Sequence, residues 1–97
     1  MEYRLLGRTG IKVSAIGLGT VPFGEQNTAA QGHEQLDHAV EHGVNLIDTA
    51  EMYSVPPRAE TYGSTERIIG SWFAKSGRRS KVVLVTKVAG PGAVLGV

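Results

Sequence analysis

The chain has 97 residues, enough for one small domain, and its ten Lys and Arg nearly balance nine Asp and Glu to give a net charge of +1. This balance gives no electrostatic footprint for nucleic acid or an anionic membrane surface, and no apolar run approaches the roughly 20 residues of a membrane span. The lack of cysteine excludes disulfide bonds and thiolate metal sites and, with no signal-peptide profile at the N-terminus, leads us to expect a cytoplasmic protein.

The first 20 residues predict a β-hairpin followed by a strand. Residues 3–6 and 11–14 are two short strand-like runs on either side of a turn with two glycines, Gly7-Arg8-Thr9-Gly10. Residues 15–20 read Ala-Ile-Gly-Leu-Gly-Thr, a strand whose glycines would let a ligand or another backbone come close. A loop over residues 21–27 follows.

A first helix is predicted to begin after Thr28. Thr28 and Gln31 have the spacing of a capping box, and Gly43 is well placed to end the helix. The apolar residues of its core-facing stripe are Leu36, Ala39 and Val40. Gly32 lies inside this helix and costs about 1 kcal/mol relative to Ala.

A second helix is predicted from a cap at Ser64 or Thr65 to about Ser76, with Gly77 as its stop. Its apolar residues recur at helical spacing and are expected to pack against the sheet: Ile68, Ile69, Trp72 and Phe73.

Two further apolar runs, residues 44–48 and 81–87, predict strands that each end in a charged residue, Asp48 and Lys87. Ligand sites of parallel sheets lie beyond the carboxyl ends of the strands, so we expect these two side chains to meet there. Tyr53, five positions after Asp48, would join them in a proton-handling cluster. The three residues could also be ordinary polar residues at strand ends, but their combined spacing favours a catalytic origin.

The loop over residues 49–63 is long and has Pro56-Pro57 at its centre, and loops of this length in compact domains are more often functional than accidental. The order of hairpin, strand, helix, strand, helix and strand predicts an α/β fold with a parallel sheet and right-handed crossovers. Two helices cannot cover such a sheet fully, so the chain is expected to be the start of a larger fold.

Four segments together resemble the aldo-keto reductase family: residues 17–20, 43–53, 63–66 and 85–87. The loop over residues 53–61 looks most like the Tas branch of that family, and the resemblance covers residues 1 to about 90. It implies the N-terminal part of a (β/α)8 TIM barrel, left incomplete. The chain would be one partial domain over residues 1–97, with a hairpin (1–14), three parallel strands with two helices (15–88) and a Gly-rich tail (89–97).

The resemblance implies NADPH-dependent reduction of aldehydes or ketones, with a small carbonyl compound as substrate. Tyr53 would be the general acid, Lys87 would favour the ionised form of the phenol because a nearby cation stabilises it, and Asp48 would hold Lys87 by an ion pair. The expected cofactor-binding residues are Gly19, Thr20 and Asp48. The pattern G-x-G-x-x-G with a following helix is absent, so the cofactor would bind at a barrel mouth and not in a Rossmann domain.

Two parts of the family's site have no counterpart in these residues: a catalytic His after a fourth strand and the main adenosine contacts in the last strands. We therefore expect the chain alone to be inactive. The alternative is a non-catalytic partial-barrel module, or a truncated relic, that acts through association. In both cases exposed sheet edges predict a homo-oligomer or a complementing chain.

No metal site is expected. His38 and His42 are four residues apart on one helical face, but zinc needs three or four ligands, and His33 would point elsewhere. A solvated helix face is the better interpretation of the pair.

Overall fold

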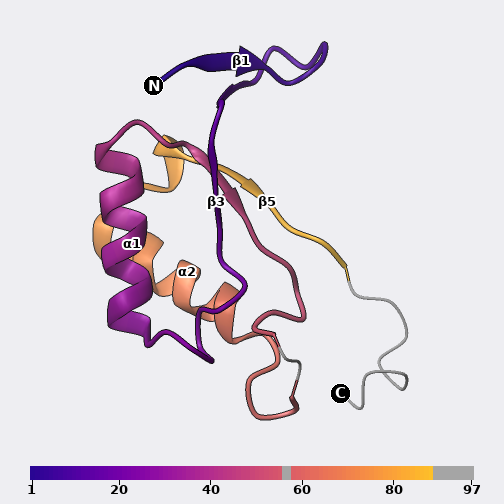
Figure 1. The fold of residues 1–97 in the computed structure, drawn as a ribbon, viewed down its shortest axis with the longest axis vertical. Coiled ribbons are helices and arrows are strands. Elements are labelled where there is room, and N and C mark those ends of the chain that lie inside the picture. The colour runs from indigo at the N-terminus through magenta and orange to yellow at the C-terminus, as the bar shows by residue number, and fades with distance from the viewer. Residues whose placement is uncertain (56–57, 89–97) are drawn as a thin grey trace.

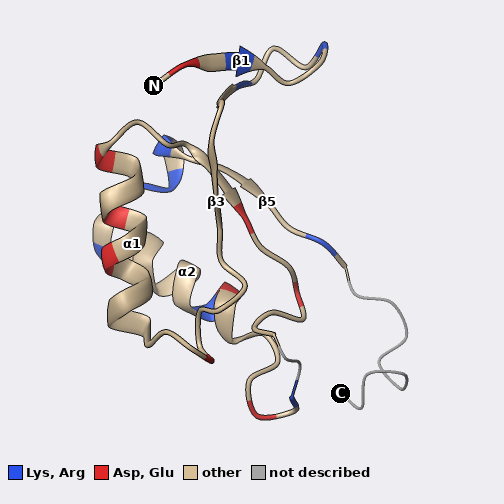
Figure 2. Ribbon diagram, viewed as in Figure 1, with Lys and Arg blue, Asp and Glu red and all other residues tan. Residues whose placement is uncertain are grey.

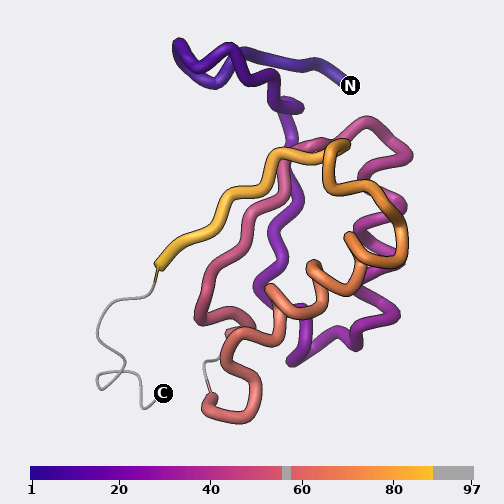
Figure 3. Tube along the Cα trace, turned by 180° about the vertical axis from the view of Figure 1, so that it is seen from behind, coloured from indigo at the N-terminus to yellow at the C-terminus, as the bar shows by residue number. Residues whose placement is uncertain are grey.

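The computed structural model describes residues 1–55 and 58–88, so the interpretations of Pro56-Pro57 and of the tail (89–97) lie outside the described residues. A two-stranded hairpin precedes a three-stranded parallel sheet, and both helices lie on the same side of the three strands (Figures 1 and 3). The elements in chain order are β1 (Tyr3–Leu5), β2 (Lys12–Ser14), β3 (Gly17–Gly19), α1 (Ala29–Glu41), β4 (Leu46–Asp48), α2 (Ser64–Ser76), a 3₁₀ turn η1 (Arg79–Lys81) and β5 (Val83–Val85). The predicted α/β class and element order are confirmed.

The hairpin is fastened to the end of the sheet at which the strands begin. β1 and β2 pair antiparallel with Tyr3 opposite Ser14. The Asn45 carboxamide accepts a hydrogen bond from the Ser14 N–H at 2.7 Å and donates one to the Lys12 carbonyl at 3.0 Å. The Tyr3 hydroxyl donates to the Gly43 carbonyl at 2.6 Å. The hairpin therefore leaves the opposite, carboxyl end of the sheet open.

α1 begins at the predicted capping box. The Thr28 hydroxyl accepts from the Gln31 N–H at 3.2 Å, and the Gln31 carboxamide accepts from the Thr28 N–H at 2.9 Å. His42 is the C-cap and not a helical residue. Gly43 follows with φ of +88°, a left-handed conformation that glycine adopts without steric cost.

The predicted cap of α2 was wrong. Gly63, with φ of +78°, is the N-cap, and no side chain caps this helix. The Thr65 side chain is fully buried, and its hydroxyl donates to the Phe23 carbonyl at 2.7 Å instead. The chain enters α2 through the left-handed conformation of Gly63, which glycine adopts without steric cost. Thr65 therefore does not cap the helix, and its hydroxyl can donate to the Phe23 carbonyl in the loop before α1.

The third strand of the sheet is shorter than predicted. Residues 79–81 form η1, so the strand does not begin at Lys81, and β5 covers only Val83–Val85. Gly77 ends α2 as predicted, donating its N–H to the Phe73 carbonyl at 2.9 Å. Arg78, Arg79 and Lys81 follow the C-terminal end of α2, where the helix dipole favours positive charge.

Within residues 1–55 and 58–88 the helices cover one face of the sheet and leave the other uncovered. Leu18, Ile47 and Leu84 stand in one row of the register and pack on the helices. Strand neighbours alternate between faces, so the rows before and after point away from the helices. Val85, in the second of these rows, is 39% exposed. The apolar strand sequences are typical of a sheet that is buried on both faces. In the described residues, helices cover only one face of this sheet.

The core lies between the helices and the sheet, as the apolar spacing of both helices predicted. Its buried members are Phe23, Leu36, Ile47, Ile68, Ile69, Trp72 and Val82. The Trp72 indole N–H donates to the Asp37 carboxylate at 2.9 Å and so connects α2 to α1. Trp72 is therefore a core residue that also joins the two helices.

Gly32 has a packing reason that the sequence did not reveal. A Cβ at this position would lie 3.1 Å from Cδ2 of Phe23 and 3.2 Å from Cγ2 of Ile68. Phe23 is fully buried and Ile68 is 9% exposed, so neither can move aside easily. The glycine lets α1 approach α2 and the loop before α1.

We predict that Gly32→Ala lowers the free energy of unfolding by about 1 kcal/mol. Overpacking typically costs about 1–3 kcal/mol, and the better helix propensity of alanine returns up to about 1 kcal/mol. The matched control is Gly70→Ala in α2, where an added Cβ meets nothing within 4 Å, so this change should stabilise by up to about 1 kcal/mol. Urea unfolding curves give both values, and equal effects of the two changes would contradict the packing argument.

Candidate active site at the carboxyl end of the sheet

Backbone hydrogen bonds fix the ends of the three strands relative to one another. Gly19, Asp48 and Val85 stand side by side in the register. Thr20 donates both its N–H, at 3.2 Å, and its hydroxyl, at 2.8 Å, to the Asp48 carbonyl. The Thr49 N–H donates to the Val85 carbonyl at 2.8 Å. The residues that follow each strand therefore start from a rigid edge.

Asp48 and Lys87 form an ion pair at this edge. The Lys87 Nζ lies 2.9 Å from Oδ1 of Asp48 and 2.8 Å from the Thr49 carbonyl oxygen. The side chains of Lys87 and Asp48 are 49% and 47% exposed, so the pair is accessible from solvent. The hydrogen bond to Asp48 is the main cause that raises the pKa of Lys87 above its ordinary value; burial opposes it, and Tyr53 adds to it. Lys87 is therefore held as a cation.

Tyr53 lies beside this cation. The Lys87 Nζ is 5.1 Å from the centroid of the Tyr53 ring, within the range of a cation–π contact. The Tyr53 N–H donates to the Ala50 carbonyl at 3.2 Å, and its carbonyl accepts from the Thr65 N–H at 3.3 Å. The loop after β4 is thus tied to the start of α2, and the three residues predicted from the sequence lie together. Their catalytic roles stay predictions.

The predicted cofactor-binding residues differ in accessibility. Gly19 is exposed, and an added Cβ would meet nothing within 4 Å, so the surface beside β3 is open. Asp48 is half-exposed, whereas Thr20 is fully buried and its hydroxyl is committed to the Asp48 carbonyl. Gly19 and Asp48 are thus accessible at the strand end, whereas the Thr20 hydroxyl is used within the fold, and the cofactor-binding roles of the three residues stay predictions.

The sequence analysis missed two acidic residues that flank the lysine. The Glu51 N–H donates to the Lys87 carbonyl at 3.0 Å, and its carboxylate accepts from the Tyr62 hydroxyl at 3.2 Å. Burial and this carboxylate raise the pKa of Tyr62 above its ordinary value. The Glu66 carboxylate accepts from the Thr86 hydroxyl at 2.7 Å. Both acids lie in segments that the family resemblance had singled out, and that was the only signal pointing to them.

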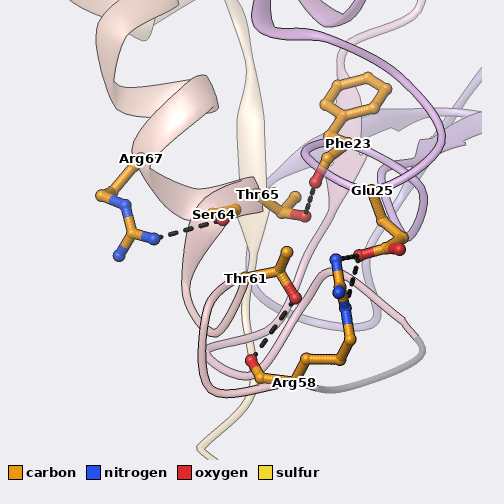
Figure 4. Close-up of polar contacts among 7 residues, drawn as sticks. All are labelled: Phe23, Glu25, Arg58, Thr61, Ser64, Thr65 and Arg67. Carbon is orange, nitrogen blue, oxygen red and sulfur yellow. Dashed lines mark hydrogen bonds and ion pairs between the residues drawn. The ribbon is translucent and has the colours of Figure 1, made fainter.

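A second group of polar contacts joins the loop before α1 to the loop before α2, near the site (Figure 4). The Arg58 guanidinium contacts one carboxylate oxygen of Glu25 through Nη2 at 2.9 Å and Nε at 3.3 Å. The hydroxyl of Thr61 approaches the Arg58 carbonyl at 3.5 Å. Together with the bond from Thr65 to Phe23, these contacts fix the loop before α1 against the loop before α2. Residues 33 positions apart form the ion pair, so local sequence patterns could not predict it.

The three histidines have different environments. The His33 Nε2 lies 2.8 Å from the Ser71 hydroxyl and 3.1 Å from the Ile68 carbonyl, so this half-buried ring bridges α1 and α2. The rings of His38 and His42 are 4.2 Å apart, and both residues are exposed, as expected for a solvated face. Within residues 1–55 and 58–88 no group of three or more His, Cys, Asp or Glu residues is arranged to hold a metal ion.

Acidic and basic residues are both distributed over the helices and loops (Figure 2). Asp37 and Glu41 of α1 lie 3.4 Å and 3.8 Å from guanidinium nitrogens of Arg78, which connects the helix to the turn after α2.

In the part of the chain that the structure describes, no helix has both the length and the apolar character to cross a membrane.

Comparisons with known proteins assign a family to this arrangement. The model described as the Aldo/keto reductase family matches residues 15–95. Protein tas of Escherichia coli (strain K12) is 54% identical over 91 residues, covering 94% of this chain and 26% of that protein. The uncharacterized oxidoreductase YrpG of Bacillus subtilis (strain 168) is 47% identical over 92 residues, covering 94% and 27%.

A solved structure shows the same backbone arrangement. The aldo-keto reductase AKR11C1 from Bacillus halodurans, in its holo form, superposes with a TM-score of 0.74 at 31% identity, over 91% of this chain and 26% of that one. The chain therefore spans about a quarter of the length of these relatives. The predicted incomplete (β/α)8 barrel is confirmed.

We predict that Asp48→Asn lowers the pKa of Lys87 toward the ordinary lysine value of 10.5, because it removes the carboxylate that holds the ammonium. The folded-state pKa is raised, so the pair stabilises the fold below the ordinary pKa, and this contribution is lost as the pH rises through the raised value. NMR titration of the Lys87 side chain measures the shift. Asp37→Asn is the control, since that carboxylate pairs with Arg78. An unchanged Lys87 titration in Asp48→Asn would overturn the assignment.

We also predict that Thr65→Val destabilises the fold by about 1–3 kcal/mol, because it leaves the buried Phe23 carbonyl without its side-chain donor while the volume of residue 65 hardly changes. Thr61→Val removes only a contact at 3.5 Å and should cost less than about 1 kcal/mol. Urea unfolding of the two variants tests this. A Thr65→Val cost no larger than that of Thr61→Val would show that the bond to Phe23 does not stabilise the loops.

Proposed function

The chain belongs to the aldo/keto reductase family, and from this premise we propose that it supplies the acid–base residues of an NADPH-dependent reductase that converts aldehydes or ketones to alcohols. Family members generally use NAD(P)H. The observation that carries the proposal is the Asp48–Lys87 ion pair at 2.9 Å, with the Tyr53 ring beside the ammonium. Such a cluster at the carboxyl ends of parallel strands is where a barrel enzyme places its reacting groups.

Tyr53 holds the proton of the reaction in this proposal. NADPH, when bound, supplies the hydride, and the phenol of Tyr53 gives its proton to the carbonyl oxygen of the substrate. Loss of that proton leaves a phenolate, which the adjacent Lys87 ammonium stabilises because opposite charges attract at short range. The cation therefore favours the state that follows proton transfer.

Asp48 keeps that cation in place. Its carboxylate raises the pKa of Lys87 and so further favours the charged form of the lysine. Its carbonyl accepts two bonds from Thr20, which hold the end of β4 against β3. A neutral side chain at position 48 would remove the ion pair and leave the ammonium its hydrogen bond to the Thr49 carbonyl. Asp48 is in this proposal a positioning residue for Lys87.

The chain spans about a quarter of the length of its relatives, so the proposed activity belongs to a complete reductase and not to these residues alone.

We propose the cytoplasm as its location, which the lack of cysteine supports. The small carbonyl compound would reach the site from the open, carboxyl end of the sheet, opposite the hairpin (Figure 1).

We predict the effect of Tyr53→Phe in a chimera in which this chain replaces the stretch of Escherichia coli Protein tas that it matches. The unsubstituted chimera should oxidise NADPH in the presence of a reactive aldehyde. Tyr53→Phe should lower kcat by about 10²–10⁴-fold, the usual contribution of a positioned acid, with little change in NADPH affinity. Absorbance of NADPH measures turnover, and its fluorescence measures binding.

Tyr3→Phe makes the same chemical change in the hairpin, at the far end of the sheet, and should retain the activity of the chimera. Full turnover by Tyr53→Phe would remove the tyrosine from the proposed reaction. A folded chimera that binds NADPH but reduces no aldehyde or ketone would contradict the proposed function itself.

A further inference from the structure

The segment that carries Lys87 follows β5 and lies outside the strand. β5 ends at Val85, and two backbone hydrogen bonds hold the residues after it to the chain that follows β4. The Thr49 N–H donates to the Val85 carbonyl at 2.8 Å, and the Glu51 N–H donates to the Lys87 carbonyl at 3.0 Å. Both bonds come from the same neighbouring segment. They therefore fix the distance to that neighbour but do not by themselves fix how the segment lies relative to the helices.

A side-chain hydrogen bond supplies the third contact. The Thr86 hydroxyl, between the two bonded carbonyls, donates to the Glu66 carboxylate at 2.7 Å. Glu66 is half-buried in the first turn of α2. A hydrogen bond to an ionised carboxylate is roughly twice as strong as one between neutral groups. This bond therefore ties the segment with Lys87 to the helix layer, which the two backbone bonds do not reach.

The same turn of α2 also holds the loop that carries Tyr53. The N–H of Thr65, a fully buried residue, donates to the Tyr53 carbonyl at 3.3 Å. Two adjacent residues of α2 thus contact the two segments that carry the phenol and the ammonium. The 5.1 Å between the Lys87 Nζ and the centroid of the Tyr53 ring depends on both contacts.

We propose that Glu66 and Thr86 are positioning residues for the acid–base pair. Their hydrogen bond holds Lys87 where its ammonium reaches the Asp48 carboxylate and the Tyr53 ring. Both residues act through Lys87 and not on the reacting atoms. This inference rests on the proposed function, because it concerns the same site.

The simpler role of Glu66 would be to stabilise α2 alone, since a negative charge in the first turn of a helix is favourable. That role needs no partner on another segment. Thr86→Val removes only the partner, keeps the charge of Glu66 and nearly keeps the shape of residue 86. Thr86 is exposed, so the fold should survive this change. Thr86→Ser keeps the hydroxyl and is the conservative variant that should preserve the positioning.

The first test is NMR titration of the Lys87 side chain in this chain. The Asp48 carboxylate and Tyr53 raise the pKa of Lys87. Thr86→Val changes no charge, so a fall of the Lys87 pKa toward the ordinary value of 10.5 reports that the ammonium has moved away from these partners. We expect this fall in Thr86→Val and not in Thr86→Ser, with circular dichroism to verify folding. An unchanged Lys87 titration in Thr86→Val would overturn the proposal.

The second test measures turnover in the chimera with Escherichia coli Protein tas. Misplacement of a catalytic group by about 1 Å can cost about 10²-fold, so Thr86→Val and Glu66→Ala should each lower kcat at least about tenfold, with little change in NADPH affinity. Thr86→Ser should retain most of the activity. Glu34→Ala, which removes an exposed acid from α1, is the control for the change in charge and should be fully active.

The two tests separate this inference from the proposed function. Full turnover by Tyr53→Phe would overturn the proposed function, and the Lys87 titration would still decide the positioning. A chimera that depends on Tyr53 but keeps its kcat in Thr86→Val would overturn this inference alone. Equal losses of kcat in Thr86→Val and Thr86→Ser would show that the hydroxyl of residue 86 is not what positions Lys87.

Discussion

The register of the three parallel strands is the constraint on which the rest of the molecule depends. Gly19, Asp48 and Val85 end level with one another, and the bonds from Thr20 and Thr49 extend the ladder by one step past the strands. From this edge the Lys87 ammonium reaches both the Asp48 carboxylate and the Thr49 carbonyl. A slip of one residue in β5 would turn Val85 toward the helices and displace the lysine from its partners.

One-sided burial is the second property that shapes the chain. Both helices cover the face that carries Leu18, Ile47 and Leu84, and the opposite face has no helix over it within the described residues. The apolar strand sequences suit burial on both faces, as in closed parallel barrels. The mismatch between sequence and environment is explained by family membership, since this chain spans about a quarter of the relatives it matches.

Local signals predicted most of the fold. The capping box at Thr28 and the apolar spacing of α2 depend on residues close in sequence, so they could be found without a structure. The pairing of Asp48 with Lys87 joins residues 39 apart, yet it was predictable because parallel strands end at the same edge. Tyr53 was expected beside them because it follows Asp48 by five positions, and the family resemblance supplied its role as general acid.

Other features depend on tertiary contacts that leave no local pattern. The cap of α2 at Gly63 was missed because Thr65 is used to satisfy a carbonyl in a distant loop. Gly32 looked like a defect of the helix until its neighbours Phe23 and Ile68 were known. Glu25 and Arg58 belong to the loops before α1 and α2, which come together because the two helices pack against each other. Glu51 was visible only as part of a motif, and its contact with Tyr62 required the folded loop.

Amide hydrogen exchange at the carboxyl edge of the sheet tests the central claim most directly. The N–H groups of Thr20, Thr49 and Glu51 donate to the carbonyls of Asp48, Val85 and Lys87. If the ladder positions the site, these three amides are protected to a similar degree as the amides of α1 and α2. Exchange of the three at unprotected rates, with both helices still protected, would show that the strand ends are not held together and would contradict the account.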